Sequence, residues 1–182
     1  ENGGNYFTLI DRQMENINRV IGILKKYNKK GWLLHIDADE LITFPKNKSV
    51  KRFLKEINKR IMNNQIDENI NHLHFTNWEI TPTNGYSDNC FLEEHNFKTN
   101  GYYYNSYGNG KSAGLLKNGI QPHGPHGFGN DFGTFTYNVP IDLGILLHYD
   151  SCNFKEWVKK FKNLGKFKKN GKGGIQNPFK SY

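Results

Sequence analysis

The sequence predicts an α/β fold in which a mixed sheet is flanked by helices. Two segments repeat apolar residues at helical spacing: residues 12–29 and the segment that begins at Ser49. Short apolar runs, the first at residues 32–36, have the length and composition of buried strands. The 182 residues include 13 Phe and 10 Tyr, enough for one domain with a buried core. We expect residues 1–165 to form this domain and the basic, Gly-punctuated residues 166–182 to form a flexible tail.

The first helix is expected over residues 12–29, with Asp11 as its N-cap. Its apolar positions recur at helical spacing and are Ile17, Val20, Ile21, Leu24 and Tyr27. Gly31 ends this helix, and residues 32–36 follow as a short buried strand. The strand leads directly into the acidic cluster Asp37-Ala38-Asp39-Glu40.

After the second helix, residues 69–80 have the pattern of a strand with a bulge or bend. Residues 81–110 are rich in Gly, Asn, Asp and Tyr, so we expect a long loop, a feature that in compact domains indicates function or disorder. Short strands are expected at residues 111–117 and 134–138, on either side of a Gly/His-rich stretch at 121–127.

The last expected strand covers residues 143–149 and places His148 near its end. Asn153 is then expected to cap a final helix. The apolar side of that helix consists of Phe154, Trp157, Val158, Phe161 and Leu164.

The net charge of +8, from 25 basic and 17 acidic residues, favours anionic partners. The basic residues are spread over helix faces and the tail instead of forming one stripe interleaved with aromatic residues. This distribution is typical of solvated faces and disfavours nucleic acid as the partner.

No apolar run reaches the roughly 20 residues of a membrane span, and no signal-peptide pattern is present. Because the chain opens with Glu1 and not Met, we expect it to be processed, excised or incomplete. Its two cysteines, Cys90 and Cys152, are enough for one disulfide and form no metal-binding pattern. The compartment stays open between the cytoplasm and the secretory lumen.

The acidic cluster is the strongest functional signal. Side chains alternate along a strand, so Asp37 and Asp39 are expected to point to the same side. Two carboxylates at the carboxyl end of a strand suit Mg²⁺ or Mn²⁺, and open α/β sheets bind ligands at that edge. A cation held there would neutralise a diphosphate leaving group. Glu40 is expected to point away and to support the loop or a neighbouring basic residue. The alternative is a purely structural turn.

Two further groups are candidate ligands. His148 could complete a Mn²⁺ site, or could be a core histidine bonded to the backbone. His123 and His126 lie in the Gly/Pro loop, where they could contact a diphosphate or an acceptor. Lys111 sits between Gly110 and Ser112, where the backbone can approach an anion closely. A P-loop is excluded, because Asn105 stands where that motif requires Gly.

If a hydroxyl acceptor displaces the diphosphate leaving group, the reaction requires a base to deprotonate that hydroxyl. Three carboxylates in expected loop regions are candidates: Glu93, Glu94 and Asp131. The alternative for each is an ordinary solvated position. We favour Glu93 or Glu94, because Phe91-Leu92 supplies apolar anchors beside them.

These motifs together resemble a known family. The segment Trp32-Leu33-Leu34-His35-Ile36-Asp37-Ala38-Asp39-Glu40-Leu41-Ile42 resembles the Trp-x-x-x-x-Asp-x-Asp-Glu-Phe/Leu signature of family 2-like and family 92-like glycosyltransferases. Weaker likenesses follow in the same order as in that family. They are Arg12-Gln13, Gly110-Lys111-Ser112, Pro122-His123-Gly124-Pro125-His126, Leu147-His148-Tyr149 and Phe154-Lys155-Glu156-Trp157.

The resemblance implies a GT-A-type fold, with the family's N-terminal nucleotide-binding strands having no counterpart before residue 1. It implies that Asp37 and Asp39 bind the metal, with His148 as a third ligand or a diphosphate contact. It also implies that Lys111 and His126 contact the phosphates or the acceptor. The implied activity moves a sugar from a nucleotide-diphosphate sugar to a hydroxyl of a glycan, protein or lipid. The alternatives are a non-catalytic glycan- or polyanion-binding module and a metal-dependent phosphodiesterase.

Overall fold

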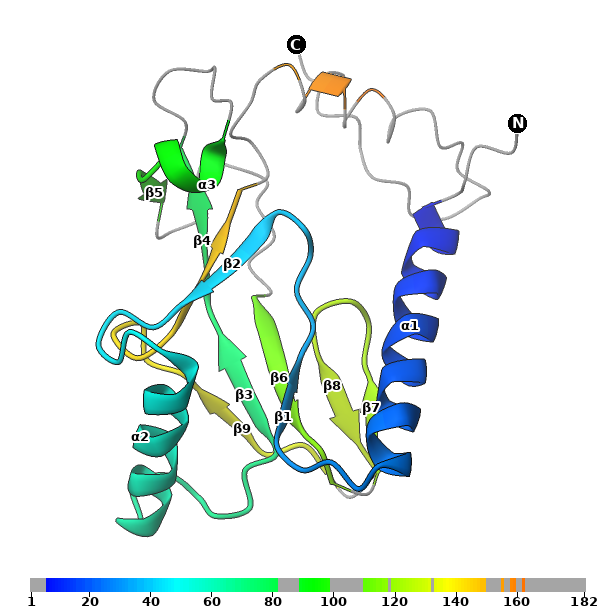
Figure 1. The fold of residues 1–182 in the computed structure, drawn as a ribbon, viewed down its shortest axis with the longest axis vertical. Helices are drawn as coiled ribbons and strands as arrows, with labels where there is room; N and C mark the ends of the chain where they lie inside the picture. The colour runs from blue at the N-terminus through cyan, green and yellow to red at the C-terminus, as the bar shows by residue number, and fades with distance from the viewer. Residues whose placement is uncertain are drawn as a thin grey trace.

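The computed structural model describes residues 6–81, 89–98, 110–117, 119–131 and 133–149, together with the single positions 155, 158, 159 and 162. These residues form a mixed α/β fold of several sheets and a few helices (Figure 1). The helices are α1 (Tyr6–Lys26), α2 (Val50–Met62) and α3 (Cys90–Glu93). The strands are β1 (Trp32–Leu34), β2 (Glu40–Thr43), β3 (His72–Phe75), β4 (Asn77–Ile80), β5 (Phe97–Lys98), β6 (Lys111–Leu115), β7 (Ile120–Pro122), β8 (Phe128–Asn130), β9 (Thr136–Asn138) and β10 (Ile145–His148).

The first helix is longer at its start than expected. It already includes Tyr6, so the predicted N-cap at Asp11 is wrong and that residue lies inside the helix. The helix ends at Lys26, before the predicted stop at Gly31. Asn28 adopts a positive φ of 49°, and the N–H of Lys29 donates to the carbonyl of Leu24 over 2.9 Å. A left-handed Asn after the last turn is a common way to end a helix.

The second helix begins where the sequence predicts. The Ser49 hydroxyl accepts a hydrogen bond from the N–H of Arg52 over 3.3 Å, so Ser49 is the N-cap of this helix. Phe53 and Ile57 are buried beneath this helix. The first residue of the helix, Val50, is 55% exposed.

Two four-stranded sheets form the centre of the fold. Sheet A has the strand order β1-β6-β3-β9, and sheet B has the order β2-β10-β4-β5. The pairs β3–β9 and β4–β10 are parallel and the others are antiparallel. A separate hairpin, β7–β8, flanks the Gly/His-rich stretch.

The chain passes from sheet A to sheet B three times, the last time between β9 and β10. It bends at Thr76 between β3 and β4, which confirms the bend predicted within residues 69–80. It also crosses through residues 35–39, between β1 and β2. Regular strand structure ends at Leu34, and the N–H of Glu40 donates to the carbonyl of Asp37 over 3.1 Å. Asp37 and Asp39 therefore lie in a turn and not in a strand, so the expectation that they point to the same side is wrong: Asp37 contacts Lys111 of sheet A and Asp39 lies beside His148 of sheet B.

The helices pack on separate apolar cores. Phe53 and Ile57 of α2 pack with Phe44, Leu73, Phe75, Ala113 and Leu146. The α1 residues Ile17 and Ile21 pack with Ile120 and Phe128 of the hairpin. Residues of β1 contact both cores in alternation: Trp32 and Leu34 pack on the α2 core, and Leu33 packs on the α1 core. Figure 1 shows α2 and α1 on either side of sheet A.

Other expectations have mixed outcomes. The segment expected to be one long loop contains α3 and β5. The strand expected over residues 143–149 is confirmed as β10. Of the expected last helix, positions 155, 158, 159 and 162 are helical, while Asn153, Phe154, Trp157, Phe161 and Leu164 lie outside the described residues. The expected tail, 166–182, also lies outside them.

Among the described residues, no helix combines the length and apolar character that a membrane span requires.

Candidate functional site

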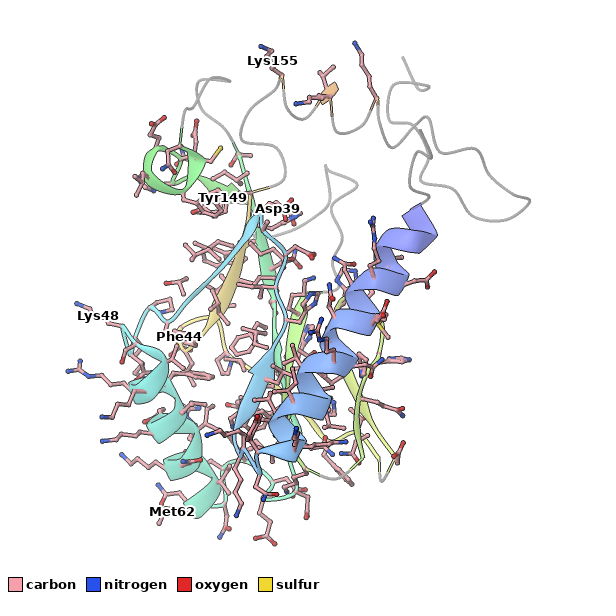
Figure 2. All side chains as sticks on the ribbon, turned by 45° about the vertical axis from the view of Figure 1, so that its right-hand side comes forward. Asp39, Phe44, Lys48, Met62, Tyr149 and Lys155 are labelled. Carbon is pink, nitrogen blue, oxygen red and sulfur yellow. The ribbon has the colours of Figure 1, made fainter. Side chains whose placement is uncertain are left out.

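The acidic turn at residues 37–40 lies where sheet A meets sheet B, because it joins β1 to β2. The N–H of Tyr149, which follows β10, donates to the carbonyl of Asp39 over 2.8 Å. Figure 2 shows these two residues together at one end of the sheets. The turn therefore brings its carboxylates to an edge shared by strands from both sheets.

Asp37 faces sheet A and helix α1. Its Oδ1 accepts a hydrogen bond from Nε2 of Gln13 over 2.9 Å, and its Oδ2 accepts one from Nζ of Lys111 over 2.7 Å. The side chain remains 32% exposed. Asp37 is thus a partly accessible carboxylate whose charge is already balanced by an ammonium group.

Lys111 begins β6, an inner strand of sheet A, and its side chain has no exposed surface. Its Nζ donates to the carbonyl of Pro125 over 2.8 Å and lies 3.4 Å from Oε2 of Glu40. Glu40 is equally buried and accepts the N–H of Asp37 over 2.7 Å. The expected support of the loop and of a basic residue by Glu40 is confirmed, but the expectation that it points away from Asp37 is wrong, since both carboxylates contact Lys111. We assign Lys111 to the turn and not to a phosphate, because its ammonium is enclosed by protein.

Asp39 faces sheet B. Its Oδ2 lies 3.8 Å from Nε2 of His148, the last residue of β10. The other ring nitrogen of His148, Nδ1, lies 2.7 Å and 2.9 Å from the two carboxylate oxygens of Glu79 on β4. Asn77 in turn donates to Oε1 of Glu79 over 2.6 Å and accepts the N–H of Gly110 over 3.2 Å. His148 therefore lies between two acids and has a fixed orientation.

His126 lies in the β7–β8 loop and is brought towards Lys111, Asp37 and Glu40. Its carbonyl accepts the N–H of Ser112 over 2.9 Å. Burial, followed by the nearby Lys111 ammonium, lowers the pKa of His126 below its usual 6.5. The ring is therefore neutral near pH 7, where it can donate or accept a hydrogen bond but adds no positive charge.

The candidate bases occupy different places. Glu93 is exposed at the end of α3, and Glu94 is buried just after it. The Phe91 ring of α3 packs on Tyr149 with 4.6 Å between ring centroids, so α3 lies near His148. The N–H of Asp131 donates to the carbonyl of Gly119. Gly119 follows the last residue of β6, whereas Lys111 is the first residue of that strand. The structure does not bring Asp131 to the acidic turn.

Sequence reasoning missed three polar residues that position this site: Gln13, Asn77 and Glu79. Glu79 had a detectable signal, because a carboxylate between Trp78 and Ile80 is unusual in an apolar strand. Gln13 belongs to the Arg12-Gln13 likeness, which gave it no role, and Asn77 carries no comparable signal. Within the ranges that the structure describes, no group of three or more His, Cys, Asp or Glu side chains is arranged to hold a metal ion.

Comparison with known proteins gives one finding. Over 154 residues the chain is 25% identical to a curated protein of Arabidopsis thaliana named glycosyltransferase-like. The match covers 74% of this chain, and the chain spans about a third (32%) of that protein's length. No protein family model matches the chain. No solved structure matches it either.

Proposed function

We propose that this chain contains the cation- and diphosphate-binding part of a glycosyltransferase. The enzyme would move a sugar from a nucleotide-diphosphate sugar to a hydroxyl acceptor. The observation that carries the proposal is the pairing of Asp39 and His148 at the edge where the two sheets meet. The similarity to a glycosyltransferase-like protein supports the reaction class. In this proposal the fold is of the GT-A type and Asp37-Ala38-Asp39 is its Asp-x-Asp motif.

The residues present fit a divalent cation such as Mn²⁺ or Mg²⁺. A separation of 3.8 Å between Asp39 Oδ2 and His148 Nε2 is too long for a hydrogen bond but suits two ligands of one cation. Mg²⁺ is commonly bound by one or two carboxylates together with substrate phosphates and water, so two protein ligands are sufficient. A cation bound there would neutralise the charge that develops on the diphosphate leaving group.

Asp37 has a different part in this proposal. Its oxygens accept hydrogen bonds from Gln13 and from the Lys111 ammonium, which already balances its charge, so Asp37 has less to gain from a cation than Asp39 has. We therefore assign the two ligand positions to Asp39 and His148. Asp37, with Lys111 and Glu40, keeps the turn in the conformation that presents Asp39.

Two residues are assigned to the substrates. Neutral His126 is proposed to contact the diphosphate from the β7–β8 loop. Glu93 is proposed as the base for the acceptor hydroxyl, because it is exposed on α3, which packs beside Tyr149. Glu94 is buried and the structure places Asp131 elsewhere, so both are weaker candidates.

Calorimetry with nucleoside diphosphates, in Mn²⁺ and then in EDTA, tests the proposal directly on this chain. We expect binding that requires Mn²⁺ and that is lost in Asp39→Asn and in His148→Gln. Transfer or hydrolysis of nucleotide sugars in a donor panel should require the same residues. Asp142→Asn is a matched control, since that carboxylate is exposed and pairs loosely with Lys46 at 3.9 Å.

Nucleotide binding that does not depend on Mn²⁺, or that is retained in both Asp39→Asn and His148→Gln, would refute the proposed site. Glycan binding without any nucleotide binding would favour a non-catalytic module instead. Mn²⁺-dependent cleavage of a chromogenic phosphodiester would favour a phosphodiesterase.

A further inference from the structure

His148 lies in a row of polar residues that crosses sheet B. In the strand pairing it is directly opposite Glu40 of β2 on one side and Glu79 of β4 on the other. Glu40 is directed to Lys111, at 3.4 Å, which leaves Glu79 as the carboxylate that contacts the imidazole. The side chains of His148 and Glu79 are only 10% and 15% exposed, so water does not replace this contact easily.

The contact has a definite chemical direction. An ionised carboxylate only accepts hydrogen bonds, so a bond between Glu79 and Nδ1 of His148 requires the proton to be on Nδ1. In a neutral imidazole this leaves Nε2 without a proton, so that its lone pair can accept a hydrogen bond or bind a cation. Nε2 is the nitrogen that faces Asp39.

We propose that Glu79 is a positioning residue that holds His148 in the Nδ1–H tautomer and directs the Nε2 lone pair to the space beside Asp39. The inference rests on the proposed function for the identity of the ligand, a divalent cation. Carboxylates that accept the free N–H of a metal-binding imidazole fix its tautomer and make it a stronger ligand.

The position of Glu79 is itself fixed. Its Oε1 accepts a hydrogen bond from the amide of Asn77, two residues earlier on β4. The other end of the Asn77 amide accepts the N–H of Gly110, which immediately precedes Lys111. Glu79 is therefore connected through Asn77 to the start of β6, the strand whose Lys111 donates to Asp37. The Glu79 carboxylate cannot turn away from His148 without breaking these hydrogen bonds.

Nitrogen-15 imidazole spectra of the metal-free protein at pH 8 test the positioning role without any activity assay. The His148 signals are assigned by their loss in His148→Gln. We expect an unprotonated Nε2 in the wild type and a substantial Nε2–H population in Glu79→Gln, whose amide can also donate to Nδ1. Glu68→Gln is the matched control, because Glu68 is exposed, and it should leave the spectrum unchanged.

An Nε2–H or doubly protonated ring in the wild type would overturn the proposal, as would an unchanged tautomer in Glu79→Gln. The free Mn²⁺ signal in electron paramagnetic resonance gives a second readout. Glu79→Gln should weaken Mn²⁺ binding about 10- to 100-fold, and Glu79→Asp should recover part of it. Unchanged Mn²⁺ affinity in Glu79→Gln would also count against the role.

The two readouts separate this inference from the proposed function. If the wild type shows the expected tautomer and Glu79→Gln changes it, but no Mn²⁺ binds, Glu79 orients His148 and the metal-dependent function is wrong. If Mn²⁺ binds at Asp39 and His148 while Glu79→Gln changes neither readout, the function stands and the role of Glu79 is wrong.

Discussion

Replacing Lys111 with Met should destabilise the protein strongly, because Lys111 and Glu40 form an ion pair whose side chains have no exposed surface. Methionine preserves most of the aliphatic volume and removes the charge. Glu40 would then stay buried, with the N–H of Asp37 as a remaining hydrogen-bond donor. The turn would also lose the cation that balances Asp37.

The size of the effect follows from the geometry. At 3.4 Å, and with an effective dielectric constant of about 20, the attraction between Lys111 and Glu40 is roughly 5 kcal/mol. Removing one member of a buried pair typically costs about 3–5 kcal/mol, because the other charge is left in the interior. The bond to Asp37 adds less, since that carboxylate is 32% exposed and water can replace the ammonium.

Urea unfolding of Lys111→Met, Glu40→Gln and the double variant measures this contribution. We expect the free energy of unfolding to fall by about 3–5 kcal/mol in Lys111→Met. The double variant should cost at least about 1 kcal/mol less than the sum of the single variants. Lys117→Met is the control, because this exposed lysine follows the same strand, and it should stay within about 0.5 kcal/mol of the wild type. A cost below about 1 kcal/mol for Lys111→Met, or strictly additive costs, would refute the reasoning.

Three other predictions concern stability. Burial lowers the pKa of both His72 and His74 below 6.5, so the unfolded chain binds more protons than the folded protein once the pH falls below that value. The free energy of unfolding, measured in urea, should therefore decrease as the pH drops below about 6.5, by up to about 1.4 kcal/mol per pH unit for each histidine. In His72→Gln the free energy of unfolding should change less with pH. A wild-type free energy of unfolding that does not change with pH in this range would contradict the prediction. Gly110→Ala should cost about 2 kcal/mol or more, because Gly110 has a φ of +58° and an added Cβ would collide with the Phe75 carbonyl, whereas Gly22→Ala meets nothing within 4 Å and should be neutral or stabilising. Cys90 is disulfide-bonded, and Cys152 is the chain's other cysteine. Reductant should therefore release two thiols in a thiol titration and lower the melting temperature, with a loss of about 2–4 kcal/mol in the free energy of unfolding. Free thiols before reduction would contradict this.

The sequence is most informative where the determinants are local. The apolar spacing after Ser49 predicts α2, and the bend between β3 and β4 is visible as an irregular alternation around Thr76. The acidic cluster is correctly placed after the first strand, because the apolar run before it is short and unbroken. Each of these features depends on residues within a few positions of one another.

The geometry of the site depends on pairings between distant segments, so the sequence does not determine it. Strand β1 ends at Leu34, which pairs with Ala113 of β6, and the chain then crosses to sheet B. That crossing places Asp37 and Asp39 in a turn, with one facing Lys111 and the other facing His148. Lys111 has small, polar neighbours and looks accessible in sequence, yet β6 lies between β1 and β3 and buries it.

The position of β10 has a consequence for biosynthesis. It is the last described strand in the sequence, yet it lies inside sheet B, between β2 and β4. Those two strands have no hydrogen-bonded pairing with each other, so a nascent chain that has not yet delivered residues 145–148 from the ribosome cannot assemble sheet B. The strands of sheet A precede β10 and can pair earlier, whereas the α2 core, which includes Leu146, and the contact between the acidic turn and His148 are completed only when β10 has emerged.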